Sequence, residues 1–237
     1  EIKIDGEFRR VRFHDYHEIY PIPGLYETIF YRTLRCNSPE VIVGLLQDVL
    51  DEHEFDIEDL RLLDFGAGNG MMAEALQRAG AHHAWGIDIL PEAKEASERD
   101  RPWVYNDYFV ADLTDLDEKT EQALNDADLN ALAVVAALGY GDIPVKAFQT
   151  SYNLVGTGGW IAFNIKEDFL RDDDETGFAR LIHKMTGKGL IQMEAYRRYT
   201  HRLAITGEPL HYIAAIARKL EDIPDEYVDE AQQNATA

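Results

Sequence analysis

The residues best suited to chemistry form one glycine-rich segment, which runs from Asp64 through Gly66 and Gly68 to Gly70. An apolar run over residues 60–65 predicts a buried strand before it, and a helical pattern over residues 71–79 follows it. Glycines at such a turn let the backbone approach a ligand closely, while the helix start offers unpaired N–H groups. In a doubly wound sheet, the first turn of this kind is where a nucleotide-like cofactor binds.

Three carboxylates end successive predicted strands near this turn. Asp64, two residues before the first glycine, can hold a cationic amine. Asp88 ends the second strand and can accept hydrogen bonds from both hydroxyls of a ribose. Asp112 ends the third and can accept from an exocyclic adenine amine, although an aspartate there often only caps a turn. The dinucleotide fingerprint needs its third glycine one place later, where Met71 stands.

The elements that must position these residues alternate along the chain. Further strands are predicted over residues 84–89, 108–111, 129–135 and 160–165, with helices over residues 91–100, 145–154 and 179–189. This alternation indicates a mostly parallel α/β sheet with helices on both faces. Two extended runs, 193–206 and 210–219, are joined by Gly207-Glu208-Pro209 and predict an antiparallel hairpin at the end of a doubly wound sheet.

The chain divides into three predicted parts. Residues 1–38 form a cap, extended at first and then two short helices around the elbow from Pro21 to Pro23. Residues 39–220 form the cofactor-binding domain, which begins with a helix from Ser38 to about His53. Residues 221–237 are acidic and poor in large apolar side chains, and we expect this tail to fray.

Composition excludes several classes of protein. The 237 residues are 46% hydrophobic, which excludes a disordered chain, and no apolar run approaches the ~20 residues of a membrane helix. The net charge of −21 argues against nucleic acid as a partner, and no membrane partner is expected. A small-molecule partner is favoured over a protein. The single cysteine, Cys36, and scattered histidines predict no disulfide and no metal site, and a cytoplasmic location is expected. The oligomeric state is not readable.

These motifs resemble the class I S-adenosylmethionine-dependent methyltransferases over residues 40–220. The likeness rests on the glycine segment, on Gly86-Ile87-Asp88, on Ala111-Asp112-Leu113, and on Gly156-Thr157-Gly158-Gly159 before a strand. It implies a seven-stranded sheet whose last strand inserts antiparallel, with S-adenosyl-L-methionine as cofactor and S-adenosyl-L-homocysteine as product. It also implies cofactor-binding roles for Asp64, Gly66, Ala67, Gly68, Gly70, Asp88, Ile89, Asp112, Leu113 and Ala136.

The sequence departs from the family after the fourth strand, in the run from Val135 to Asp142. No Asn-Pro-Pro-aromatic box stands there, which counts against amino methylation of adenine, cytosine or glutamine. No cysteine stands there either, which counts against carbon-5 pyrimidine methylation. The Leu-Gly-Tyr-Gly-Asp stretch over residues 138–142 is closest to a small, poorly characterised subgroup, which names no substrate.

Several side chains are candidates for contact with the methyl acceptor. A base is needed only if the acceptor carries a proton, and the candidates are Tyr140, Asp142 and His201. Tyr16 and Tyr20 are candidates for a substrate-binding lid or for simple packing. Arg198 belongs to a basic patch at residues 197–202, which has two interpretations. Either the patch binds an anionic acceptor, or its side chains only face outward from a strand.

The function expected from these observations is methyl transfer to an oxygen or nitrogen of a small molecule, by in-line displacement at the sulfonium methyl group. Two alternatives stay open. One is a nicotinamide-dependent oxidoreductase, which would share the sheet and the second-strand acid. The other is a methyltransferase-like protein that binds the cofactor without catalysis, for which the bland segment after the fourth strand is the best argument.

Overall fold

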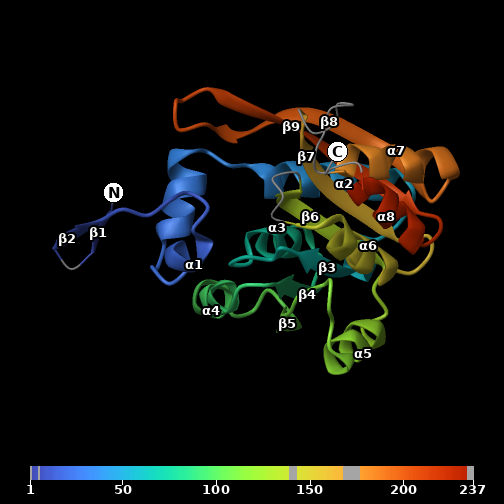
Figure 1. Cartoon of the computed structure of the whole chain (residues 1–237), viewed down its shortest axis with the longest axis horizontal. Coiled ribbons are helices and arrows are strands. Elements are labelled where there is room, and N and C mark those ends of the chain that lie inside the picture. Colours follow the sequence, from blue (N-terminus) through green and yellow to red (C-terminus); the bar gives the residue numbers. More distant parts are fainter. Residues whose placement is uncertain (1, 5, 139–142, 168–176, 234–237) are drawn as a thin grey trace.

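The computed structural model describes residues 2–4, 6–138, 143–167 and 177–233. Within them a seven-stranded sheet runs through the body in the order β5-β4-β3-β6-β7-β9-β8 (Figure 1). The strands are β3 (Arg61–Phe65), β4 (His83–Asp88), β5 (Asp107–Val110), β6 (Ala131–Leu138), β7 (Trp160–Lys166), β8 (Ile191–Leu203) and β9 (Pro209–Lys219). The first five are parallel, and β9 lies antiparallel between β7 and β8. The predicted doubly wound α/β sheet with a terminal antiparallel hairpin is confirmed.

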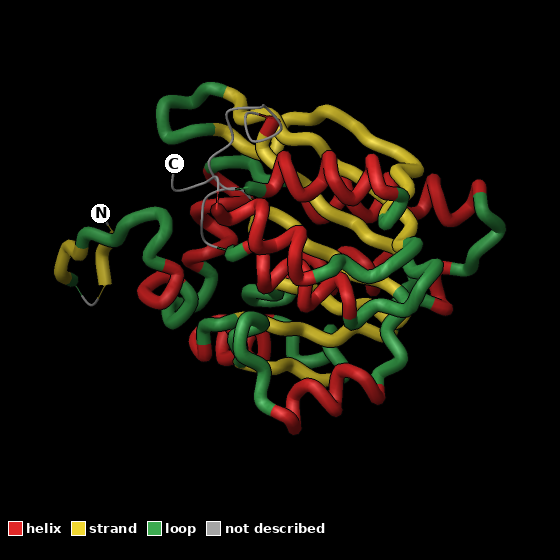
Figure 2. The backbone as a smooth tube through the Cα atoms, turned by 45° about the vertical axis from the view of Figure 1, so that its right-hand side comes forward, coloured by secondary structure: helices red, strands yellow, loops and turns green. Residues whose placement is uncertain are grey.

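Helices cover both faces of the sheet, as the tube view shows (Figure 2). One face carries α2 (Ser38–Glu52), α3 (Met71–Ala79) and α4 (Pro91–Asp100). The other carries α5 (Glu118–Asp126), α6 (Val145–Asn153), α7 (Phe178–Lys188) and α8 (Asp225–Gln233). Strand residues alternate between the two cores: Leu62 packs against α2, whereas Leu63 packs on the α6 side. A short 3-10 helix, η2 (Ile57–Asp59), leads into β3.

The N-terminal segment lies over the carboxyl ends of the parallel strands. It contains a small hairpin of β1 (Ile2–Ile4) and β2 (Glu7–Arg9), which projects from the body, and then α1 (Tyr16–Ile19) and the π-helix η1 (Glu27–Thr33). The backbone oxygen of Tyr20 accepts a 3.0 Å hydrogen bond from Arg99, and Glu27 accepts one of 2.9 Å from Arg101. These bonds fasten the segment to the body. The two short helices lie on either side of the elbow from Pro21 to Pro23.

The C-terminal tail, which we expect from its composition to fray, contains a helix in the structure. Residues Asp225–Gln233 form α8, in which Val228 and Ala231 are buried against α6 and α7. The ammonium of Lys184 also lies 3.9 Å from the ring centroid of Tyr227. A few well-placed apolar side chains therefore order a segment whose composition is mostly acidic. Helix α5 was also not expected, and Asp117 caps its start through two backbone N–H groups.

Candidate functional site

The glycine turn between β3 and α3 has a backbone that only glycine adopts readily. Gly66, Gly68 and Gly70 have φ values of 73°, 53° and 86°, all in the left-handed region. A Cβ atom on Gly68 would lie 2.6 Å from the hydroxyl oxygen of Tyr20. The turn therefore presents backbone without side chains, and the hydroxyl of Tyr20 from the N-terminal segment lies directly against it.

Asp88 is held in place by the glycine turn itself. Its Oδ2 accepts a 3.0 Å hydrogen bond from the backbone N–H of Gly68, and its Oδ1 accepts one of 3.0 Å from Leu90. Burial raises the pKa of this carboxyl, and the backbone bonds oppose that shift. A carboxylate has about four lone-pair sites, so both oxygens can still accept from further hydroxyl groups.

Asp88 lines a cavity of about 280 Å³, called the larger cavity below. Its walls beyond Asp88 are mostly apolar and include Ile89, Leu113, Ala136, Ala137 and Ile143. Ile89 is 61% exposed, which is unusual for a large apolar side chain at the end of a buried strand. The cavity thus offers a fixed carboxylate at one point and apolar surface around it, which suits a nucleoside.

Asp112 also lines the larger cavity, and it caps the turn that follows it. Its Oδ1 accepts from the backbone N–H of Thr114 at 2.8 Å and from the Thr114 hydroxyl at 2.7 Å. These bonds lower the pKa of the Asp112 carboxyl. The capping role is thus present, and both bonds use the same oxygen, so Oδ2 is left for a ligand.

Asp64 is a buried acid beside the turn. It is 2% exposed, and its Oδ2 accepts a 2.7 Å hydrogen bond from the hydroxyl of Tyr105. Burial raises the pKa of Asp64 to about 7, although the bond from Tyr105 opposes this shift. Among the described residues no lysine or arginine pairs with it. The site therefore fits a ligand that brings its own cation, as the amine of S-adenosylmethionine would.

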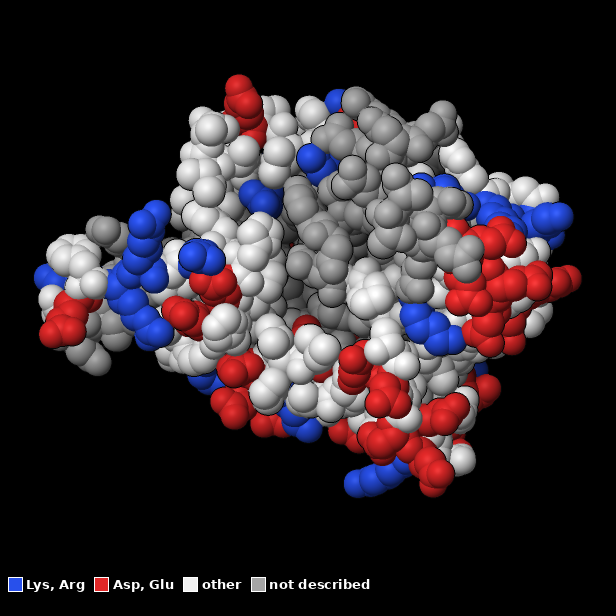
Figure 3. Space-filling view, in the orientation of Figure 1, with Lys and Arg blue, Asp and Glu red and all other residues white. Residues whose placement is uncertain are grey.

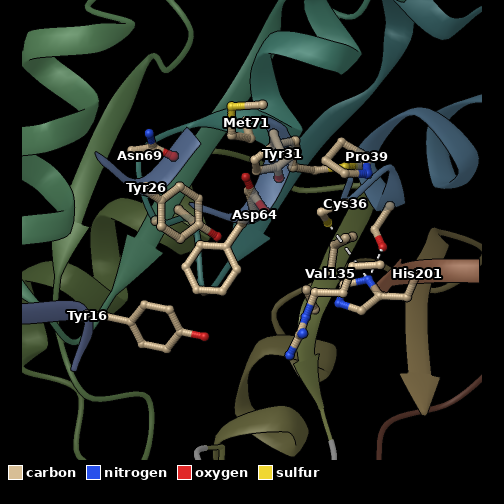
Figure 4. A pocket seen from close by; sticks show the side chains of 18 of the residues that line it. Tyr16, Tyr26, Tyr31, Cys36, Pro39, Asp64, Asn69, Met71, Val135 and His201 are labelled. Atoms are coloured by element: carbon tan, nitrogen blue, oxygen red, sulfur yellow. Dashed lines mark hydrogen bonds between the residues drawn. The ribbon is translucent and has the colours of Figure 1, made fainter. Parts of the chain in front are cut away.

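Asp64 lines a second cavity of about 80 Å³, called the smaller cavity below (Figure 4). The two cavities share Tyr16, Tyr26, Gly66, Val135 and Ala136 as walls. They therefore meet between the glycine turn and the end of β6, beneath two tyrosines of the N-terminal segment.

Ala136 stands at this junction in a strained conformation. Its φ is 61°, and the register of β6 against β7 shifts between Val134 and Leu138. Its backbone N–H donates a 2.6 Å hydrogen bond to Oδ1 of Asn164. Bulges and left-handed non-glycine residues cluster at functional sites, where the surrounding structure maintains the strain.

His201 lies on the far wall of the smaller cavity. It is 4% exposed, and its Nδ1 lies 2.6 Å from the hydroxyl oxygen of Ser38 at the start of α2. Burial, with a smaller effect of Arg202, lowers the pKa of His201 to about 3. The imidazole is therefore neutral at pH 7, which favours a hydrogen-bonding role over general-base catalysis.

Only some of the remaining predicted residues line the two cavities. Tyr16 lines both cavities and Tyr20 the larger one, while their rings also stack at 6.0 Å, so these tyrosines both line the site and pack. Arg198 pairs with Glu167 at 3.0 Å outside the two cavities, and Arg202 on the same strand lines the smaller one instead. Tyr140 and Asp142 lie outside the described residues.

Sequence reasoning missed the tyrosines that support the turn from below. Besides the Tyr105 bond to Asp64, the hydroxyl of Tyr108 donates a 2.8 Å hydrogen bond to the backbone oxygen of Gly68. The density of aromatics over residues 103–109 is the only sequence signal for them. Within the described part of the chain, no cluster of three His, Cys, Asp or Glu is placed to hold a metal ion, and no helix has the length and apolar character to cross a membrane.

Comparisons with known proteins agree with this fold. A family model described as a methyltransferase domain matches residues 39–203. Two curated proteins named ribosomal protein L11 methyltransferase, from Chromohalobacter salexigens and Hamiltonella defensa, are each 50% identical over 42 residues. Those matches span 18% of this chain and only 14% of each relative.

Solved structures share the fold at low sequence identity. The N-methyltransferase NodS from Bradyrhizobium japonicum, in complex with S-adenosyl-L-homocysteine, has a TM-score of 0.56 and 14% identity over 88% of this chain and 98% of its own. A putative RNA methyltransferase from Pyrococcus horikoshii has a TM-score of 0.57 and 12% identity over 77% and 83%. At these identities the likeness concerns the fold alone.

Proposed function

The chain belongs to the methyltransferase-domain family, the class I S-adenosylmethionine-dependent methyltransferases that its motifs resemble, and we propose that it methylates an oxygen or nitrogen of a small-molecule acceptor. One observation carries the proposal. The larger cavity beside Asp88 and the smaller cavity beside Asp64 meet at Gly66 and Ala136. A cofactor lying across this junction would face an acceptor within an enclosed space.

We assign the cofactor contacts to the described residues as follows. Asp64 would pair with the amine, the backbone from Gly66 to Gly70 would lie along the chain of the cofactor, and Asp88 would accept from the ribose hydroxyls. Asp112, Ile89 and Leu113 would surround the adenine. When bound, the cofactor supplies a methyl group made electrophilic by its sulfonium. The protein then contributes alignment and exclusion of water, which need no conspicuous catalytic side chain.

The smaller cavity supports a small acceptor. It holds about 80 Å³ and is closed by aromatic side chains of the N-terminal segment, among them Tyr16, Tyr26, Phe30 and Tyr31. Acidic side chains gather on the face shown in Figure 3 over α5 and α8, in line with the net charge of −21. Such a surface repels the phosphates of RNA, so the fold shared with an RNA methyltransferase does not favour an RNA acceptor.

Calorimetry with S-adenosylmethionine, S-adenosylhomocysteine and NADH tests the cofactor assignment. We expect micromolar binding of the two sulfur compounds alone, and a loss of tenfold or more in Asp88→Ala. Asp115→Ala, which removes an exposed aspartate near the same edge of the sheet, is the matched control. Binding of NADH in place of the sulfur compounds would favour the oxidoreductase alternative.

The acceptor class is tested with methyl-labelled S-adenosylmethionine and a cell extract divided into small-molecule, RNA and protein fractions. We expect label to enter the small-molecule fraction. Label in RNA or protein would contradict the proposed acceptor class, and cofactor binding without label in any fraction would favour the non-catalytic alternative.

A further inference from the structure

The smaller cavity contains a cation for which the described residues provide no acidic partner. Arg202 lines it, and the guanidinium donates from Nη1 to the backbone oxygen of Leu203 at 3.0 Å. Among the described residues no carboxylate lies within ion-pair distance of Arg202, although the chain carries 44 acidic and 23 basic residues. Its neighbours on β8 differ, because Arg197 pairs with Asp48 and Arg198 with Glu167.

A bulge in β8 aims two consecutive side chains at this cavity. Thr200 pairs with His211 and Arg202 with Leu210, so the register shifts at His201. Consecutive residues of a regular strand point to opposite faces of the sheet. Because of the bulge, His201 and Arg202 both line the smaller cavity.

A chain of hydrogen bonds determines which nitrogen of His201 carries its proton. The N–H of Ala136 donates to Oδ1 of Asn164, so the amide nitrogen of Asn164 must donate to the Tyr199 hydroxyl, which lies 2.6 Å away. The phenolic proton of Tyr199 then points to the Ser38 hydroxyl, also at 2.6 Å. Ser38 in turn donates to Nδ1 of His201 at 2.6 Å.

The neutral ring of His201 therefore carries its proton on Nε2. Cys36 agrees with this direction, because its Sγ lies 3.8 Å from Nδ1 and burial raises the pKa of the thiol, which keeps it protonated. No described residue accepts a hydrogen bond from Nε2. This atom is also not among the fully buried polar atoms that lack a hydrogen-bond partner. Figure 4 shows the side chain of Cys36 close to the ring of His201 in this cavity. The ring can thus donate into the smaller cavity.

Building on the proposed function, we propose that Arg202 and the Nε2–H group of His201 bind a carboxylate carried by the methyl acceptor. The planar guanidinium matches a carboxylate in geometry. Arg202 is the only arginine or lysine among the described residues that line this cavity, which matches the single charge of a carboxylate. A phosphate dianion would leave one negative charge unbalanced near Asp64.

The carboxylate of the cofactor itself is the competing ligand for Arg202. Asp64 in β3 and Arg202 in β8, at the far edge of the sheet, both line this cavity, so position alone does not separate the two ligands. The test must therefore separate them.

The experiment measures binding to the S-adenosylhomocysteine complex of the full chain by calorimetry. Benzoate serves as the carboxylate probe and benzamide as its neutral counterpart of equal shape. We expect benzoate to bind at least tenfold more tightly than benzamide, and Arg202→Gln to abolish that difference while S-adenosylhomocysteine affinity changes less than threefold. Arg197→Gln, on the same strand but paired with Asp48 outside the cavity, should behave like the wild type.

Each other outcome overturns the inference. Equal binding of the two probes, or no binding of benzoate, would show that the cavity does not select a carboxylate. A tenfold loss of S-adenosylhomocysteine affinity in Arg202→Gln would assign Arg202 to the cofactor. If the wild type fails to bind S-adenosylhomocysteine at all, the proposed function fails first, and this result is seen before either probe is added.

Nitrogen-15 NMR of labelled histidine tests the donor separately. We expect the His201 signals of a neutral ring protonated at Nε2, and a shift of the Nε2 signal that saturates with benzoate but not with benzamide. In Ser38→Ala the Nδ1 signal should change because it loses its donor. A proton on Nδ1 in the wild type would overturn the assignment of His201 as a donor into the cavity.

Discussion

The hydroxyl of Tyr105 donates a 2.7 Å hydrogen bond to a carboxylate oxygen of Asp64, although the two residues lie 41 positions apart, Asp64 in β3 and Tyr105 in the loop before β5. Asp64 is 2% exposed, and this bond only partly offsets the cost of burying its charge. The protein thus keeps an acid near the glycine turn whose ionisation is disfavoured until a cation arrives. The first two predictions follow from this pair.

The stability of the ligand-free protein should fall with pH because of Asp64. Its pKa is raised from 3.8 to about 7 in the folded state, so between about pH 4 and pH 7 the folded state binds more protons than the unfolded state. The free energy of unfolding should therefore decrease across this window and level off above it, by up to about 4 kcal/mol. Urea unfolding of the wild type and of Asp64→Asn checks this, because only the difference between them isolates Asp64. A difference that does not vary with pH would contradict the prediction.

Affinity for S-adenosylhomocysteine should rise with pH toward neutrality, because the ionised form of Asp64 pairs with the amine. Tyr105→Phe removes the bond that favours the ionised form and should move the midpoint of this rise to higher pH. At pH 7 we expect a loss of about twofold to fivefold, falling to about twofold or less at pH 8, which corresponds to a pKa shift of up to about one unit. Calorimetry across pH 6–8 measures it. Tyr108→Phe is the control, since that hydroxyl contacts Gly68 and should leave the midpoint unmoved.

Gly68→Ala should disable cofactor binding for a steric reason that a second substitution relieves. The new Cβ would lie 2.6 Å from the Tyr20 hydroxyl, and the residue would be strained at φ 53°. We expect a loss of affinity of at least tenfold. Tyr20→Phe removes the clashing oxygen, so the double variant should recover part of the loss, and the backbone strain of roughly 1 kcal/mol should remain.

Gly187→Ala is the matched control for that series. A Cβ there would meet nothing within 4 Å, and the position lies inside helix α7, where alanine is favoured over glycine by about 1 kcal/mol. This variant should bind S-adenosylhomocysteine like the wild type and unfold at slightly higher urea. Equal losses of affinity in both glycine variants would contradict a specific clash with Tyr20.

Lys219→Met should destabilise the fold without changing the site. The Lys219 side chain is 1% exposed, and its ammonium donates to the backbone oxygens of Tyr152, Asn153 and Val155 at the C-terminal end of α6. Removing it takes a donor from all three carbonyls, although that of Tyr152 still accepts from the N–H of Val155, and we expect a cost of about 2–4 kcal/mol. Urea unfolding measures this loss, with the exposed Lys188→Met as control. S-adenosylhomocysteine affinity should be unchanged, because Lys219 lies at the opposite edge of the sheet from the glycine turn.

The sequence predicted the features that depend on local signals. The glycine turn was recognisable because left-handed backbone requires glycine at residues 66, 68 and 70. The alternation of apolar runs predicted the sheet, and the Gly207-Glu208-Pro209 turn predicted its antiparallel end. Asp88 and Asp112 were recognisable because the carboxyl ends of neighbouring parallel strands share one edge of the sheet.

Features that depend on distant contacts were not predictable in this way. Helix α8 was expected to fray because its composition is acidic, but Val228 and Ala231 find partners on α6 and α7. The basic patch on β8 was visible, yet its alternation did not show that a bulge would turn Arg202 inward and leave Arg198 outside. This bulge, at Thr200-His201-Arg202, contains no glycine that would mark it in the sequence.

By itself, then, the sequence determined the fold class and the cofactor turn of this methyltransferase, because backbone torsion preferences and apolar periodicity act within a few residues. The tertiary structure decided the chemistry around that turn. Tyr105 lowers the cost of a charge on Asp64, and Ser38 determines the proton position on His201 from 163 residues away. Burial and hydrogen bonding set the pKa and the donor direction of a side chain, and both depend on neighbours that only the folded chain brings together.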